Sequence, residues 1–420
     1  MSKHLLSRGR IFLSITSALL FLAVVIPNSL QKTTAAVQIA SFILSLGVIK
    51  AKFISKNLLL MFAMSLVVTV VYILIGLHNG APIISVYQVV IIYIASPLMW
   101  IFISFGLLST IGKERLVRVF SFLGILCTIS VGIYFFLYLR YGPDAVDFFT
   151  DHSNINLNDG YAAAVLHVYG SLIFLAGGFF AAPEKVKSKW HRILLLTTIF
   201  IAAVTSGRAA LILAVPIGLA VNLAFRTENH SARGSHTARR IISISILFLT
   251  LVIGVFLITL LTSIDLGNIY TQFINKMAAG GGEARVDQMA ALLNGIYGNN
   301  GLGSGHGVGV DYVRNTDFPW RYEAIWVATV FRVGIIGALI YSAPFFIYIA
   351  KIIKKSAKRG LSSTDKFYFG SFLCVFIASN TNPYIEAVSF QWMYVIPLAI
   401  FFGELSYNKL AVPRHNNPAS

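Results

Sequence analysis

Charged residues are scarce in this sequence, and cysteines are almost absent. Only 12% of the 420 residues are charged and 57% are hydrophobic, whereas soluble domains carry about 25% charged and about 45–50% apolar residues. The two cysteines lie in apolar stretches, without the close spacing of a disulfide framework or a thiol metal site. These shortages exclude a soluble enzyme, an intrinsically disordered chain and a disulfide scaffold. Apolar runs recur from residue 11 to residue 403, each near the ~20 residues that cross a bilayer, and predict an all-α polytopic membrane protein.

We predict about twelve transmembrane helices in a single domain that occupies residues 1–420. One stretch, residues 193–225, has basic flanks at both ends, so it must cross the membrane twice. The break then falls at Thr205-Ser-Gly-Arg208, in the middle of that stretch. We interpret the polar segment 379–386, which joins the last two spans, as a turn. The predicted spans are 11–27, 34–49, 58–77, 84–108, 119–139, 161–182, 193–206, 209–225, 241–262, 324–350, 367–379 and 388–403.

The net charge of +17 is spread over short basic clusters between the apolar runs. Such clusters orient a membrane protein through the positive-inside rule, and they do not indicate nucleic-acid binding. Most of the 33 Lys and Arg residues fall on one side of the predicted topology, and most of the 16 Asp and Glu residues fall on the other. We therefore expect both termini in the cytoplasm and the long polar loop 263–323 outside. Apolar side chains at helical spacing predict a short amphipathic helix at residues 283–296 of this external loop.

Motifs that bind nucleotides or metals are missing. The glycine run at residues 298–309 lacks the Lys-Ser/Thr pair of a P-loop and the register of a dinucleotide fingerprint. The sequence contains no His/Cys cluster that would predict a metal centre, and we expect no cofactor. Any reaction at the outer face must therefore use a substrate that arrives already activated.

Two arginines are placed to bind an anion. Arg208 follows Ser206-Gly207 at the outer end of the broken hairpin, where its planar guanidinium can donate two parallel hydrogen bonds to a lipid pyrophosphate. The alternative is an arginine that anchors the helix at the lipid headgroups. Arg285 falls in the first turn of the predicted helix 283–296, where the helix dipole favours an anion. The alternative there is a local ion pair with Glu283 or Asp287.

Five more polar residues lie before or within the span predicted at 324–350. His306 lies in the glycine run and is either catalytic or solvated. A flexible loop of this kind favours the solvated histidine. Arg314 and Arg321 are either substrate-binding residues or plain surface charges. Glu323, at the membrane edge, is either a general base or an ion-pair partner. Arg332 must face the protein interior, and we interpret it as a structural pair or a hydrogen-bond hub.

Three motifs follow one another along the chain between residues 205 and 337. Thr205-Ser-Gly-Arg-Ala-Ala-Leu211 follows a transmembrane stretch. After the long external loop with Arg285 comes Asn300-Gly-Leu-Gly-Ser-Gly-His-Gly307. Trp320-Arg-Tyr-Glu-Ala-Ile-Trp326, followed by Arg332-Val-Gly-Ile-Ile-Gly337, then opens the next span. This order resembles the O-antigen polymerase and O-antigen ligase superfamily of bacterial cell-envelope proteins. The resemblance covers about residues 190–400 by motif order and the whole chain by topology.

This resemblance implies a GT-C-like glycosyltransferase of the bacterial cytoplasmic (inner) membrane that uses undecaprenyl-pyrophosphate-linked glycans and no metal. Members of the family have an arginine after the broken span and another in the large loop, held to bind pyrophosphate, which correspond to Arg208 and Arg285. The ligase branch typically shows His-Asn where this chain has Glu323-Ala324, and this departure favours a polymerase. Either Glu323 or His306 would then be the base.

The leading expectation is a polymerase that moves a growing O-antigen, capsule or exopolysaccharide glycan from its lipid pyrophosphate onto the next lipid-linked repeat unit. The resemblance also implies a chain-length regulator as a partner. One alternative is an O-antigen ligase, which moves the finished glycan to lipid A core or another acceptor. Another is a flippase or transporter of lipid-linked oligosaccharides. That last class predicts short loops and deep charges in several spans, whereas only Arg332 is deep in this sequence.

Overall fold

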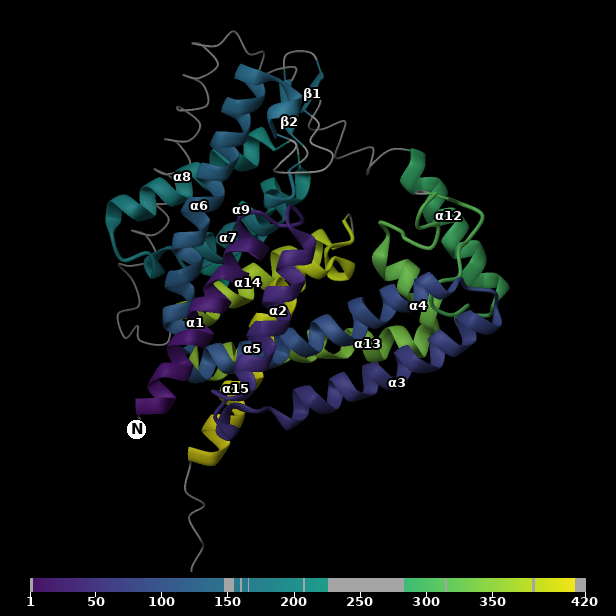
Figure 1. The fold of residues 1–420 in the computed structure, drawn as a ribbon, viewed down its shortest axis with the longest axis horizontal. Coiled ribbons are helices and arrows are strands. Elements are labelled where there is room, and N and C mark those ends of the chain that lie inside the picture. The colour runs from purple at the N-terminus through teal and green to yellow at the C-terminus, as the bar shows by residue number, and fades with distance from the viewer. Residues whose placement is uncertain are drawn as a thin grey trace, which may run out of the picture. The chain divides into compact units, whose positions relative to one another are not determined.

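A computed structural model of the chain describes residues 3–146, 155–158, 161–164, 166–206, 208–225, 283–313, 316–379 and 382–411 (Figure 1). The chain divides into two compact units. The first unit comprises Met1–Phe120, Ala284–Lys351 and Val375–Ser420, and the second comprises Ser121–Glu283 and Ile352–Cys374. Helices cover most of the described residues in both units, as the sequence predicted.

The first unit is built from long helices. Its amino-terminal elements are α1 (Lys3–Val24), α2 (Gln31–Leu46), the short turn η1 (Ala51–Phe53), α3 (Lys56–His78), α4 (Ile83–Val89), the π-helical segment η2 (Val90–Ala95) and α5 (Ser96–Thr110). Its later elements are α12 (Glu283–Gly298), most of α13 (Ile325–Arg359), the short turns η5 (Tyr384–Glu386) and η6 (Val388–Phe390), and α15 (Trp392–Ala411). Helix α5 packs against α2 and α15.

The second unit contains most of α6 (Gly112–Tyr141) and α14 (Ser363–Ala378), together with α7 (Val168–Ala181), α8 (Lys189–Thr205) and α9 (Ala209–Ala224). The short turns η3 (Pro143–Val146) and η4 (Pro183–Lys185) also belong to it. Strands β1 (Ile155–Asn158) and β2 (Tyr161–Ala164) form an antiparallel hairpin in which Ile155 pairs with Ala164.

Glycines let the helices of the second unit approach closely. A Cβ atom added at Gly177 of α7 would lie 2.5 Å from the Cys374 sulfur and 2.6 Å from the Gly370 carbonyl oxygen, both on α14. A Cβ at Gly218 of α9 would lie 2.8 Å from the Gly177 carbonyl oxygen. Small residues at such crossings are typical of helix packing in membranes. They leave every residue of α7 buried.

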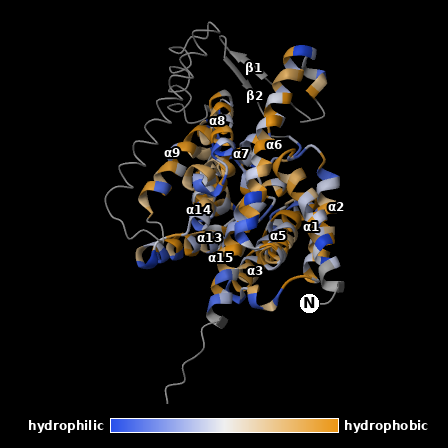
Figure 2. Ribbon diagram, turned by 90° about the vertical axis from the view of Figure 1, so that its left-hand side faces the viewer, coloured by the Kyte–Doolittle hydropathy of each residue, from blue (hydrophilic) through white to orange (hydrophobic). Residues whose placement is uncertain are grey.

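Among the described residues, five helical segments are long and apolar enough to cross a membrane: Ser7–Val24, Lys56–His78, Ile83–Thr110, Gly112–Tyr141 and Ile325–Arg359. Hydrophobic residues dominate these helices in Figure 2. Helix α3 exposes apolar side chains along its length, among them Leu60, Val67 and Leu74, as expected for a surface that faces lipid. These helices confirm a helical membrane protein, while twelve crossings and a GT-C-like fold stay predictions.

The predicted spans mostly coincide with helices, with two exceptions. The span predicted at 161–182 was wrong at its start, because residues 161–164 form β2 and the helix begins only at Val168. The three consecutive alanines of β2 count as apolar residues of a predicted span, although they form a strand and not a helix. The span predicted at 241–262 and the loop residues 263–282 lie outside the described residues.

Candidate functional site

Helix α13 is interrupted near its beginning. Gly334 has φ 67° and ψ 176°, which break the helix. The backbone carbonyls of Phe331 and Arg332 accept hydrogen bonds from the N–H groups of Ser304 (2.8 Å) and Gly305 (2.9 Å). The glycine run thus satisfies backbone groups that the break frees, as irregular backbone in a membrane protein requires.

The glycine run is a close-packed segment of the first unit. Gly303, Gly305 and Gly307 all have positive φ. A Cβ atom at Gly305 would lie 2.2 Å from the backbone nitrogen of Gly76 on α3, and one at Gly303 would lie 2.4 Å from that of Gly334. Only glycine allows both this conformation and this proximity. The run therefore seats the chain between α3 and the break in α13.

His306 is held at the end of this packed segment. The sequence favoured a solvated histidine, and this was wrong, because the residue is only 3% exposed. Its backbone N–H donates to the Tyr72 carbonyl (2.8 Å), and its Nε2 lies 3.1 Å from the Tyr341 hydroxyl. Burial, with a smaller contribution from the Arg332 charge, lowers the pKa of His306 to about 3. A base this weak is far from the ideal near the working pH, so His306 fits a neutral hydrogen-bonding role.

Arg332 is the centre of a buried ionic cluster. Its guanidinium forms an ion pair with Glu386 of η5, and the two side chains are 4% and 9% exposed. The same guanidinium donates to the Trp320 carbonyl (2.7 Å), and Tyr93 donates to the Glu386 carboxylate. This confirms the interpretation of Arg332 as a structural pair. A buried charge of this kind is tolerated only when it is paired and hydrogen-bonded.

Glu386 lies in the segment 379–386 that we interpreted from the sequence as a plain turn, so its role was missed. One signal could have identified it: a deep arginine needs a carboxylate partner, and the segment 379–386 contains a single acidic residue. Tyr93 was also missed. It lies in the π-helical segment η2, and such segments often occur at functional sites. The Ile92 carbonyl in the same segment accepts a hydrogen bond from Gln391 Nε2 (2.7 Å).

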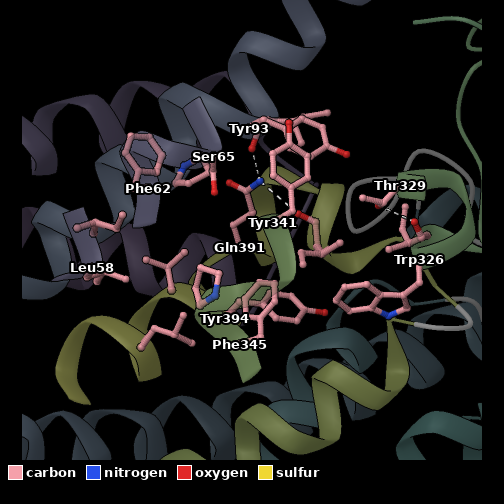
Figure 3. A pocket seen from close by; sticks show the side chains of 18 residues that line it. Leu58, Phe62, Ser65, Tyr93, Trp326, Thr329, Tyr341, Phe345, Gln391 and Tyr394 are labelled. Atoms are coloured by element: carbon pink, nitrogen blue, oxygen red, sulfur yellow. Dashed lines mark hydrogen bonds between the residues drawn. The ribbon is translucent and has the colours of Figure 1, made fainter. Parts of the chain in front are cut away.

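A cavity of about 160 Å³ adjoins this cluster, and Figure 3 shows side chains that line it. The lining residues come from α3, η2, α5, α13 and the chain from η5 through α15. Tyr93 belongs to both the cluster and the cavity wall, and Tyr341 lies beside His306. Ser65, Thr329, Gln391 and Tyr394 add polar groups to an otherwise apolar wall. The described side chains that line the cavity are all uncharged. The cavity therefore fits an apolar or uncharged group, and it lacks the cations that a pyrophosphate needs.

The two arginines assigned to pyrophosphate both lie at the beginning of a helix. Arg208 is the N-terminal cap residue of α9, immediately after the break that the sequence predicted, and its side chain is half-buried. Its backbone N–H donates to Ser206 Oγ (3.1 Å). Arg285 lies in the first turn of α12, the predicted amphipathic helix. Its side chain lies outside the described parts, so its local ion pair stays a prediction.

The other predicted site residues lie on the segment that leads into α13. The Arg321 guanidinium stands over the Phe318 ring, 5.0 Å from its centre, a favourable cation–π position. Glu323 is partly exposed, and its backbone N–H donates to Gln288 Oε1 of α12 (2.9 Å). Arg314 is outside the described residues. The structure thus groups His306 with Arg332 and ties Glu323 to α12, whereas Arg208 belongs to the second unit.

A metal centre would require several ligands in one place. Within the described ranges, no three His, Cys, Asp or Glu side chains gather in a way that could hold a metal ion. Comparison of the chain with protein-family models, with curated proteins and with solved structures found no match.

Proposed function

We propose that this protein is a polysaccharide polymerase that extends a glycan on undecaprenyl pyrophosphate at the outer face of the bacterial cytoplasmic membrane. The observation that carries the proposal is the position of Arg208 and Arg285. Arg208 is the cap residue of α9 and Arg285 lies in the first turn of α12, the places where the motifs of the resemblance put a pyrophosphate-binding arginine. A helix N-terminus is itself favourable for an anion, because its free N–H groups and its dipole both attract negative charge.

The reaction would transfer the growing glycan in one step. A hydroxyl group of the incoming lipid-linked repeat unit attacks the anomeric carbon of the growing glycan, and the bond from that carbon to the pyrophosphate oxygen breaks. The electron pair of that bond leaves with the polyprenyl pyrophosphate. Positive groups at the leaving oxygen would stabilise this developing charge, and the resemblance assigns that role to Arg208 and to Arg285.

Glu323 is the better candidate for the base that accepts the hydroxyl proton. It is partly exposed at the beginning of α13, whereas His306 is buried. Arg332 would act as a positioning residue, because it bonds the Trp320 carbonyl three residues before Glu323. The apolar cavity suits an uncharged portion of a lipid-linked substrate better than its pyrophosphate.

Complementation of a strain that lacks this gene tests the proposal. Arg208→Ala, Arg285→Ala and Glu323→Gln should each leave single repeat units in place of a glycan ladder, with protein levels unchanged. Arg192→Ala is the matched control for Arg208→Ala, because Arg192 lies in the first turn of α8, at the opposite, basic end of the same hairpin. It should retain the full ladder. Normal ladders from all three site variants would refute the proposal, and a full-length polymer retained on the lipid carrier would indicate the ligase.

One observation favours a lipid-linked oligosaccharide flippase as a second candidate. The helix break at Gly334, beside the buried pair of Arg332 and Glu386, has the form of the discontinuous helices that many transporters use. The two functions differ in the same deletion strain. Loss of a polymerase leaves repeat units exposed at the outer face, where an added glycosidase can reach them, whereas loss of a flippase leaves them protected inside.

A further inference from the structure

Helix α12 has three distinct faces. One face packs on the first unit: Leu292 is fully buried and lies in a cluster with Tyr322, Ala328 and Phe331. A second face is polar and exposed, with Asp287 and Asn294 seven residues apart. The third face is apolar and exposed. The first face contacts protein and the second faces water, whereas the third face requires a different environment.

The exposed apolar face follows the helical repeat. It consists of Val286, Met289, Leu293 and Tyr297, which occur at intervals of three, four and four residues and so form one stripe along the helix. Val286 and Tyr297 are 65% and 76% exposed. A tyrosine at the end of such a stripe is typical of the boundary between lipid and water.

The stripe is followed along the chain by the membrane-spanning helix α13, whose exposed apolar side faces lipid. After α12 the chain turns through Gly301 and Leu302, and Leu302 is exposed. The Gly301 carbonyl accepts a hydrogen bond from the Ile335 N–H (3.0 Å), which joins this turn to α13. Ile335, Ile336 and Leu339 of this membrane-spanning helix are exposed too. Exposed apolar side chains thus follow one another along the chain from α12 through Leu302 to α13.

We propose that α12 lies in the membrane interface, with the stripe Val286, Met289, Leu293 and Tyr297 inserted into lipid. The occupant of this surface is the bilayer, because the turn that follows α12 is hydrogen-bonded to the membrane-spanning helix α13, which exposes apolar side chains at the same place. The face with Asp287 and Asn294 remains in water, as in other interfacial amphipathic helices. Residues 283–302 therefore belong to the membrane-bound part of the protein, although their sequence was assigned to an external loop. This inference does not depend on the proposed function.

Site-directed spin labelling in liposomes tests the inference. Leu293→Cys puts a nitroxide on the apolar stripe. Asn294→Cys, the matched control, puts one at the next residue, on the polar face of the helix. Leu339→Cys on α13 gives the reference for lipid. Both native cysteines, Cys127 and Cys374, are buried. Labelling of the unsubstituted protein measures the background that they contribute.

The label at position 293 should be several-fold more accessible to oxygen, which dissolves in lipid, than to a water-soluble nickel chelate, as at position 339. The label at position 294 should show the reverse. Equal access of the chelate to both labels would overturn the inference. A label at 293 that neither reagent reaches would also overturn it, because a protein surface would then cover the stripe. Val286→Cys and Tyr297→Cys repeat the measurement if Leu293→Cys does not fold.

Discussion

Removal of the Arg332 charge should destabilise the first unit far more than the loss of one surface ion pair. Arg332→Met would leave the Glu386 carboxylate buried, with the Tyr93 hydroxyl as a remaining hydrogen-bond donor. Breaking a buried pair in this way typically costs about 3–5 kcal/mol, which is roughly 10²–10⁴-fold in the folding equilibrium constant. Glu386→Gln should cost a similar amount, because it leaves the arginine charge uncompensated.

The double variant Arg332→Met/Glu386→Gln distinguishes an ionic cause from lost packing. Since it removes both charges, it should be clearly more stable than the sum of the two single losses predicts. Unfolding in mild detergent can be followed by tryptophan fluorescence, because Trp100, Trp320 and Trp392 all lie in the first unit.

A second ion pair of the first unit is the control. Lys113 and Glu404 lie 2.7 Å apart, but their side chains are 17% and 25% exposed. Because water reaches both side chains, Lys113→Met should cost clearly less than Arg332→Met, about 1 kcal/mol. A cost of that size for Arg332→Met, or strictly additive losses in the double variant, would refute the assignment of Arg332 and Glu386 as a buried, interdependent pair.

Three further predictions use the same protein. Gly305→Ala should lower the free energy of unfolding by at least about 2 kcal/mol, because residue 305 has a positive φ and its Cβ would collide with Gly76. The control Gly309→Ala meets no atom closer than 3.5 Å, so it should leave that free energy unchanged in the same denaturation assay. The pKa of His306 is about 3 in the folded protein and about 6.5 in the unfolded chain, so its contribution to stability is complete above about pH 6.5 and is lost as the pH falls toward 3. Between pH 7 and pH 5 the free energy of unfolding should therefore fall by about 2 kcal/mol less in His306→Gln than in the wild-type protein. Arg208→Lys keeps the charge but not the two-pronged donor geometry, and should shorten the glycan ladder on a gel at unchanged protein levels.

Local patterns predicted the helices well. The amphipathic helix at residues 283–296 and the break before Arg208 both follow from short-range features of the sequence, namely apolar periodicity and basic flanks, and both are confirmed. The β-hairpin that includes residues 161–164 was missed, because an alanine-rich run has no feature that separates a strand from a helix end.

Long-range contacts decided what the sequence could not show. The partner of Arg332 is 54 residues away, and no local spacing identifies Glu386 as that partner. The glycine run suggested a flexible loop, yet its glycines allow close contact with Gly76, more than 220 residues earlier. Burial of His306 follows from that contact. Residues that act through tertiary packing are thus the ones that local reasoning interprets wrongly.

Reconstitution of the purified protein in liposomes tests the proposed polymerase activity most directly. The substrate is the lipid-linked repeat unit that accumulates in the deletion strain. We expect a ladder of glycans on the lipid carrier that grows in steps of one repeat unit, without added nucleotide, and no ladder with Arg208→Ala. Repeat units that remain unchanged in the presence of folded wild-type protein would contradict it.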